Sequence, residues 1–337
     1  MNRKDDHIRE ALSQNHPTND FDLIRFVPSS LTSKNVHEVD LKTTFFGHTF
    51  QAPIYINAMT GGSEQATQIN QRLAEIAKAC GLMIASGSVS AALKDPFWEE
   101  SFRILRSTNP DGCILANIGL SQNLDGAKKA IELLQANGLQ IHLNAPQEIV
   151  MPEGDRDFSH WRTRLQEIIQ QVNVPVIVKE VGFGMSTETA NELQSMGVQW
   201  IDVGGKGGTN FIEVENSRRP LPMNDFVDYG FSTVESLLDL HGKHSLTVFA
   251  SGGVRGAYDI VKSLYLGADM VGLSGYFLKL VHQHSVSECI EIINQLIQDV
   301  KGIFAVLDVN NLQELRSKKV IYDSKLNQFM KQRGIKR

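Results

Sequence analysis

The 337-residue sequence predicts an α/β fold, a (β/α)8 TIM barrel with an N-terminal extension and a long loop after the sixth strand. Eight short apolar runs alternate with amphipathic helical patterns, which is typical of buried parallel strands joined by helices. The sixth and seventh runs end in glycine-rich turns, as late strands of such barrels do. We expect one domain, with an extension and hairpin over residues 1–50, a barrel over 51–305 and a helical tail over 306–337.

The composition limits the class of protein. Hydrophobic residues make up 42% and charged residues 21%, as in ordinary globular proteins. The net charge of -5 argues against a nucleic-acid or membrane-surface partner. No run reaches the roughly 18 apolar residues of a membrane span, and the polar N-terminus lacks a signal core. Three scattered cysteines form no disulfide framework or CxxC motif, so we expect a cytoplasmic protein with a small-molecule ligand.

The N-terminal extension begins with a charged run that includes Arg3, Lys4 and His7. Such a run is typical of a solvated, frayed terminus, and it could also supply cations to a ligand. Residues 39–56 alternate in hydrophobicity around a turn at Gly47 and His48. This alternation predicts a β-hairpin ahead of the first barrel strand.

The barrel units follow in order. Helical patterns cover residues 68–80, 126–136 and 187–196, each close to a glycine (Gly81, Gly138, Gly197) of the kind that ends helices. Residues 204–229 form a long polar excursion that we expect to cover or build the site. The predicted strands cover residues 54–58, 82–86, 113–117, 139–144, 175–181, 200–203, 248–250 and 270–273.

Two glycine-rich turns could bind a phosphate group. In residues 251–255 (SGGVR), Gly253 lets backbone N–H groups approach an anion, and Arg255 adds a charged, forked donor. In residues 204–209, a second glycine cluster is followed by the hydroxyl of Thr209. Each turn alone could serve only the chain reversal, but the pair favours a phosphorylated cofactor or substrate.

The C-terminal ends of the strands, which together form the mouth of the barrel, carry hydroxyls, amides and glycines with one lysine, Lys179. This set suits a flat, polar-edged ring with a phosphate tail. Alternation along the strand separates Lys179 from Glu180, although their mutual neutralisation stays open. Residues 142–148 (HLNAPQE) add two further candidates. Glu148 could bind Mg²⁺ or simply begin a helix, and His142 could be an acid, a base or a core histidine.

The motifs RKDDH, MTGG, HLNAPQE, GDRDF, VKEVGFG, GGKGGTNF and SGGVRGAYD, in this order, resemble type 2 isopentenyl-diphosphate isomerase over nearly the whole chain. The resemblance implies an FMN-binding (β/α)8 barrel that interconverts isopentenyl and dimethylallyl diphosphate with reduced FMN, NADPH as reductant and Mg²⁺. It also implies a homo-oligomer, a tetramer or an octamer. Reduced FMN would be the acid and base of a 1,3-proton shift.

The resemblance also assigns residues. The catalytic residues would be Lys179, Gln147 and His142, and Glu148 would bind Mg²⁺. Gly204 and the pair Ser274–Gly275 depart from the usual residues of the family, which puts single contacts in doubt. The substrate would contact Arg3, Lys4, His7, His142, Asn144 and Gln147. FMN would contact Ala58, Met59, Thr60, Ser88, Asn117, Lys179, Gly204, Thr209, Gly253, Val254, Arg255, Ser274 and Gly275.

Two other classes remain open. The first is an FMN barrel oxidoreductase of the hydroxy-acid oxidase or nucleotide dehydrogenase type. The former needs a histidine–arginine pair after the seventh strand and the latter a cysteine nucleophile in the sixth loop, and the sequence has neither. The second is a flavin-binding structural or sensor protein, which would have no need of the cationic N-terminal run. The strand ends offer no obvious pair of carboxylates for acid–base work, which favours a cofactor in that role.

Overall fold

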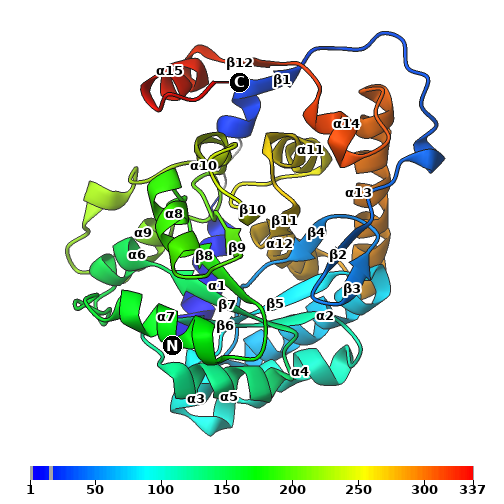
Figure 1. Ribbon diagram of the computed structural model, residues 1–337. Coiled ribbons are helices and arrows are strands. Elements are labelled where there is room, and N and C mark those ends of the chain that lie inside the picture. Colours follow the sequence, from blue (N-terminus) through cyan, green and yellow to red (C-terminus); the bar gives the residue numbers. More distant parts are fainter. Residues whose placement is uncertain (1–2, 15–17, 337) are drawn as a thin grey trace.

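The computed structural model describes residues 3–14 and 18–336 (Figure 1). Within them, eight parallel strands close into a barrel in chain order, and the last strand pairs with the first. The predicted fold class is therefore confirmed, and every predicted strand run overlaps a barrel strand. The strands are β4 (Ile54–Ile56), β5 (Met83–Ser88), β6 (Ile114–Gly119), β7 (Gly138–Leu143), β8 (Val176–Glu180), β9 (Trp200–Asp202), β10 (Thr247–Ser251) and β11 (Met270–Leu273).

Helices surround the barrel because each buries one apolar face against the strands. Gly81 ends the first of them in the left-handed conformation, as predicted. Gly138 does not end a helix, because Gln135 takes that conformation and Gly138 begins β7. The helices are α2 (Glu64–Cys80), α3 (Ser90–Lys94), α4 (Glu100–Thr108), α5 (Leu124–Leu134), α6 (Ala145–Val150), α7 (Trp161–Gln171), α8 (Thr187–Ser195), α9 (Phe211–Asn216), α10 (Thr233–Leu240), α11 (Ala257–Leu266), α12 (Gly275–Gln283) and α13 (Val286–Val306).

The predicted hairpin is formed by β2 (Thr43–Phe45) and β3 (His48–Phe50). Its turn is Phe46–Gly47, one residue earlier than predicted, because His48 already pairs with Phe45. Both turn residues have positive φ, 52° and 80°, which matches the twist of a two-residue hairpin. The Phe45 ring meets Phe249 at 5.1 Å between centroids, so the hairpin closes the end of the barrel where the strands begin.

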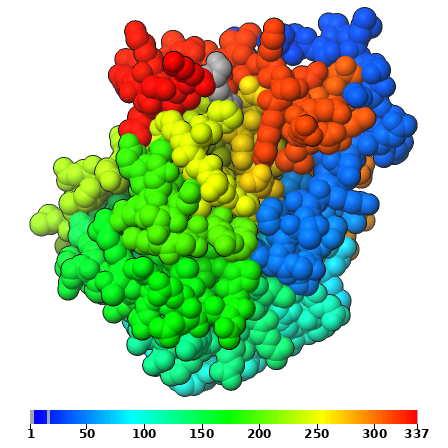
Figure 2. Space-filling view, in the orientation of Figure 1, coloured from blue at the N-terminus to red at the C-terminus, as the bar shows by residue number. Residues whose placement is uncertain are grey.

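The two ends of the chain lie together. Strand β1 (Ile24–Phe26) pairs antiparallel with β12 (Val320–Tyr322), between α14 (Leu312–Arg316) and α15 (Ser324–Gln332). Figure 2 shows the blue N-terminal segment against the orange and red C-terminal one. The prediction of a wholly helical tail is thus wrong at β12. Three residues are too few to show a period, and their partner strand comes from the other end of the chain.

The charged N-terminal run forms helix α1 (Arg3–Ser13), which packs against α2, α9 and α12. The loop after the sixth strand contains α9 and a short 3-10 helix, Asn224–Phe226. Gln14, just after α1, exchanges hydrogen bonds with the backbone of Asn210, just before α9, so these two segments are joined. None of the helices in the described ranges is long and apolar enough to cross a bilayer.

Candidate active site

A cavity of about 1160 Å³ opens at the mouth of the barrel. Ligand pockets usually measure roughly 300–1,000 Å³, so this one has room for two ligands at once. Of the residues assigned from the sequence, those that line it are Lys4, His7, Ala58, Met59, Ser88, Asn117, His142, Asn144, Gln147, Glu148, Lys179, Gly204, Thr209, Gly253, Val254, Arg255, Ser274 and Gly275.

Two assigned residues are not among the lining residues. Arg3 begins α1, and its side chain lies outside the described part of the structure. Thr60 is buried behind the cavity wall, where its Oγ1 has no hydrogen-bond partner within the described residues. By contrast Lys4, His7, Ala11 and Gln14 all line the cavity, and their spacing puts them on one face of α1. The N-terminal run is therefore a wall of the site rather than a frayed end.

Lys179 and Glu180 point to opposite sides of β8, as predicted. The Lys179 ammonium donates to the Glu180 carbonyl at 2.5 Å and to Ser251 Oγ at 3.3 Å. The Glu180 carboxylate accepts from the backbone N–H groups of Val181 and Phe183, at 2.6 and 2.9 Å. Burial raises the pKa of Glu180 to about 8. Neutralisation of Lys179 by the Glu180 side chain, which the sequence left open, is therefore ruled out by the geometry.

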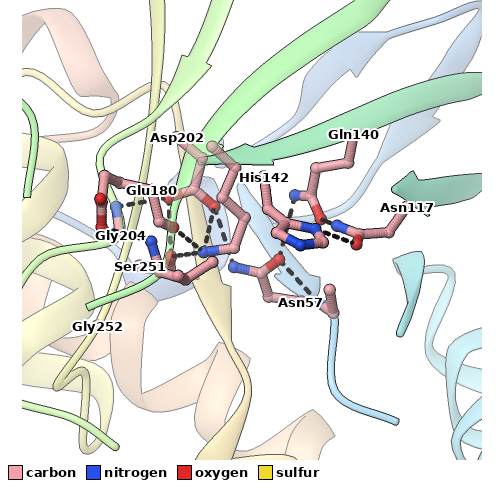
Figure 3. Close-up of polar contacts among 12 residues, drawn as sticks. Asn57, Asn117, Gln140, His142, Glu180, Asp202, Gly204, Ser251 and Gly252 are labelled. Carbon is pink, nitrogen blue, oxygen red and sulfur yellow. Dashed lines mark hydrogen bonds and ion pairs between the residues drawn. The ribbon is translucent and has the colours of Figure 1, made fainter. Parts of the chain in front are cut away.

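The carboxylate that faces Lys179 belongs to Asp202, 3.9 Å away and fully buried at the end of β9. It accepts a hydrogen bond from the Tyr55 hydroxyl. It also accepts hydrogen bonds from Ser251 Oγ at 2.7 Å and from the Gly204 N–H at 3.0 Å (Figure 3). Burial and the Asp202 charge hold the pKa of Tyr55 well above its usual value, so its hydroxyl keeps the proton that it donates. Asp202 was not among the predicted site residues, although an aspartate inside an apolar strand was an available signal.

His142 extends from β7 toward the cavity, and its Nδ1 lies 2.9 Å from Asn117 Oδ1. Burial lowers the pKa of His142 to about 3, and the Lys4 and Lys179 charges contribute in the same direction. The imidazole is therefore neutral at physiological pH. A neutral ring at this position acts by hydrogen bonding, and it carries no standing charge.

The start of α6 places three polar side chains together. Asn144 Nδ2 donates to Glu148 Oε1 at 2.8 Å, and the Asp155 N–H donates to Glu148 Oε2 at 2.8 Å. Gln147 Nε2 donates to Glu215 Oε1 at 2.8 Å. Glu148 thus keeps an oriented carboxylate at the cavity wall, in the first turn of a helix. This geometry is compatible with both sequence interpretations, a Mg²⁺ ligand and a helix-start glutamate.

Glu215, on α9, is a second buried carboxylate that the sequence analysis missed. His7 Nε2 lies 3.2 Å from it, and Arg218 pairs with it at 2.7 Å. Burial opposes its charge, but the hydrogen bonds from His7 and Gln147 and the Arg218 charge together lower its pKa. A glutamate within the polar loop after the sixth strand gave no periodic signal, so its place at the site becomes visible only in the folded loop.

The two glycine-rich turns pack against each other. A Cβ on Gly208 would lie 2.8 Å from the Gly253 nitrogen, and one on Gly253 would lie 2.7 Å from the backbone of Gly207. Gly252 and Gly253 have φ of 98° and 74°, which other residues rarely adopt. The turns therefore require glycine, and they form a cradle of bare backbone beside the Thr209 side of the cavity, of a kind that fits a phosphate ester.

The Arg255 guanidinium is oriented by carboxylates. It donates to Asp22 at 2.6 and 2.9 Å and to Asp259 at 2.8 Å. Asp22 lies in the 3-10 helix η1 (Asp20–Leu23), and neighbouring Asn19 donates to the Gly253 carbonyl at 2.7 Å. The residue lines the cavity, but its strongest contacts join the phosphate-type turn to the N-terminal segment. Direct contact of Arg255 with a phosphate remains a prediction.

Comparison with known proteins agrees with this geometry. A family described as FMN-dependent dehydrogenase matches residues 5–97 and 108–321. The isopentenyl-diphosphate delta-isomerase of Staphylococcus haemolyticus is 49% identical, over 99% of this chain and 96% of the relative. The protein of the same name from Latilactobacillus sakei is 46% identical, with the same two coverages.

Among solved structures, flavocytochrome b2 with benzoylformate has a TM-score of 0.68 at 20% identity, over 94% of this chain and 82% of that one. A mandelate oxidase variant with an FMN adduct has a TM-score of 0.63 at 14% identity, over 94% and 92%. At such identities the likeness concerns the fold alone. The identity to curated relatives is far higher, and by it the chain belongs to the isopentenyl-diphosphate delta-isomerases within the FMN-dependent dehydrogenase family.

Proposed function

We propose that this chain interconverts isopentenyl diphosphate and dimethylallyl diphosphate by a 1,3-proton shift. The observation that carries the proposal is a single cavity with room for two ligands, bounded by a glycine cradle on one side and by α1 and α6 on the other. The names of relatives that are 44–49% identical over nearly the whole chain support the same reaction.

FMN fits the cradle side. Backbone N–H groups at Gly253, Val254 and Gly275 and the Thr209 hydroxyl would hold its phosphate. Ala58, Met59, Ser88 and Asn117 would line its ring and ribityl chain, and Lys179 would place a positive charge at the ring. When bound and reduced by NADPH, FMN supplies a proton donor and acceptor together with an electron-rich face.

The diphosphate would bind on the α1 side. Lys4 and His7 face the cavity from α1, and Arg3 on the same helix would add a positive charge to that of Lys4. Glu148 is held by Asn144 and by the Asp155 N–H, and its carboxylate would share a Mg²⁺ with diphosphate oxygens. A single protein carboxylate is enough for such an ion, because Mg²⁺ commonly keeps waters and substrate phosphates as its other ligands.

Gln147 would lie beside the reacting carbons. Its amide is fixed by hydrogen bonds with Glu215 and Asn144, at 2.8 and 3.3 Å. A neutral amide can hold the alkene in place without taking up the proton that the reaction moves. The protein's task at this centre is therefore orientation and the exclusion of water, while the cations hold the diphosphate at a distance.

The test is the stoichiometry of the reductant. Substrate and product are isomers, so NADPH should be needed only in catalytic amount, and dithionite without air should replace it. Turnover in deuterated water should place deuterium in the product. Consumption of one NADPH per product formed would instead establish hydride transfer, as in the oxidoreductase alternative, and would overturn the proposal.

We further propose a cytoplasmic homo-oligomer of four or eight copies. Cys80, Cys113 and Cys289 are free and buried, which suits a reducing compartment. The oligomeric state follows from the family resemblance. Light scattering on the FMN-loaded protein would test it, since a monomeric mass would contradict the proposal.

A further inference from the structure

A row of hydrogen-bonded side chains runs inside the barrel from Asp202 to His142, and of its members Asn117 and His142 line the cavity (Figure 3). Asn57 Nδ2 donates to Asp202 at 3.0 Å, and Gln140 Nε2 donates to Asn57 Oδ1 at 3.2 Å. Asn117 Nδ2 then donates to Gln140 Oε1 at 2.9 Å, and Asn117 Oδ1 faces His142 Nδ1 at 2.9 Å. We call Asn57, Gln140 and Asn117 the amide relay. All three are buried, so water does not compete for these bonds.

The chemistry of the two ends gives the relay a direction. The Asp202 carboxylate can only accept, so Asn57 must turn its NH₂ group toward it. The Ala58 N–H donates to Asn57 Oδ1 at 2.8 Å, which fixes the same orientation independently. Gln140 must then present its NH₂ group to Asn57 and its oxygen to Asn117. The orientation of each amide therefore determines the orientation of the next one in the row.

The last member of the row is the imidazole of His142. Because Asn117 turns its oxygen toward Nδ1, that nitrogen must carry a proton. In the neutral ring Nε2 then carries a lone pair. This nitrogen lies beside Gly119, where a Cβ would come within 2.7 Å of it, and the side chain lines the cavity. The low pKa of His142 agrees with a neutral ring.

We propose that the amide relay holds His142 in its Nδ1–H form, so that Nε2 can accept a hydrogen bond from a ligand in the cavity. The matching ligand group is a hydroxyl or N–H. An ionised phosphate oxygen can take its place only if His142 gains a proton on binding. Gln140 and Asn57 are positioning residues that act through Asn117. The ligand assignment rests on the proposed function, whereas the tautomer does not.

Nitrogen NMR of the FMN-loaded protein labelled with ¹⁵N-histidine tests the tautomer directly. A His142→Asn variant identifies the His142 signals by their loss. We expect a protonated signal at Nδ1 and an unprotonated signal at Nε2, with a bias of about tenfold for one hydrogen bond. The reverse assignment in the unaltered protein would overturn the proposal. No substrate is present, so the result is independent of whether the isomerase activity is found.

Gln140→Met breaks the relay at its middle while leaving Asp202 beside Lys179 and Ser251. The Nε2–H form of His142 should rise about tenfold relative to the Nδ1–H form, with FMN absorbance showing that the protein is loaded. The matched control is Ser251→Ala, which removes a donor to Asp202 but no hydrogen bond of the relay itself, so the tautomer should not change. An unchanged tautomer in Gln140→Met, or an equal change in Ser251→Ala, would contradict the proposal.

Discussion

The two ends of the barrel are built from the same strands but differ in chemistry. Where the strands begin, Phe45 and Phe46 of the hairpin pack on Phe249 and Trp200, with ring centroids 5.1 to 6.5 Å apart. Where they end, the wall consists of glycines, amides and charged groups around a cavity. The end where the strands begin therefore serves stability, and the end where they finish serves ligand binding, as in other barrels of this type. Substitutions at the two ends should therefore have separable effects.

Phe249→Ala should give the largest change in free energy. The side chain is fully buried under the hairpin, and removal of such a ring costs about 3–5 kcal/mol of unfolding free energy. Denaturant unfolding measures the loss, and protein that stays folded should still bind FMN. Phe97→Ala is the control, since Phe97 is 72% exposed and its loss should cost at most about 0.5 kcal/mol. An equal loss of unfolding free energy at both positions would contradict the view that this end of the barrel serves stability.

Glu148→Gln should produce the opposite pattern at the mouth. The variant should fold and hold FMN normally, while the Mg²⁺ concentration needed for turnover rises by about a hundredfold. Activity measured across a Mg²⁺ series, beside the absorbance of the flavin, distinguishes the two effects. If flavin were lost while the Mg²⁺ dependence stayed the same, Glu148 would belong to the cofactor side or to the core.

Arg255→Ala should weaken FMN binding by about ten- to a hundredfold. Two causes are possible in this structure, a lost phosphate contact or a loosened turn, because the guanidinium also binds Asp22. Asp22→Asn separates them by leaving the guanidinium in place. Normal FMN affinity in Asp22→Asn favours direct contact, and a matching loss favours support of the turn. Wild-type affinity in Arg255→Ala would exclude both.

The smallest expected effect is the acid response of the Asp22–Arg255 pair. The hydrogen bond from Arg255 lowers the pKa of Asp22 from 3.8 to about 2. Since the folded state depresses this pKa, the contribution to stability is complete above about pH 4 and is lost as the pH falls toward 2. Asp22 is 43% exposed, so the contribution should not exceed about 1 kcal/mol. The free energy of unfolding should differ less between pH 5 and pH 3 in Asp22→Asn than in the unaltered protein.

The barrel could be predicted from the sequence because its signals are local. Each strand is a short apolar run beside a helical period, and glycines mark the phosphate-type turns. The hairpin turn was one residue off, since hydrophobic alternation gives the strands but not their register. Strand β12 was missed because its three residues show no pattern of their own and form a strand only by pairing with β1.

The site could be predicted in part for the same reason. Residues near the C-terminal ends of the strands, such as Asn117 and Lys179, meet at the mouth by topology alone. Asp202 and Gln140 were missed because both lie within apolar strands, where the sequence predicts core. Glu215 was missed because it reaches the site only through the fold of a long loop. What connects these three to the cavity is hydrogen bonding between elements that are distant in the sequence, which produces no sequence period.

The pairing of β1 with β12 has a consequence for the order of events during synthesis. Strand β1 is made long before its partner, Val320–Tyr322, and cannot pair until those residues have left the ribosome. The segment just before β1 carries Asn19 and Asp22, the contacts that support the phosphate-type turn. The cradle therefore gains its full support only once Val320–Tyr322 have been made, and we expect cofactor loading to follow that step.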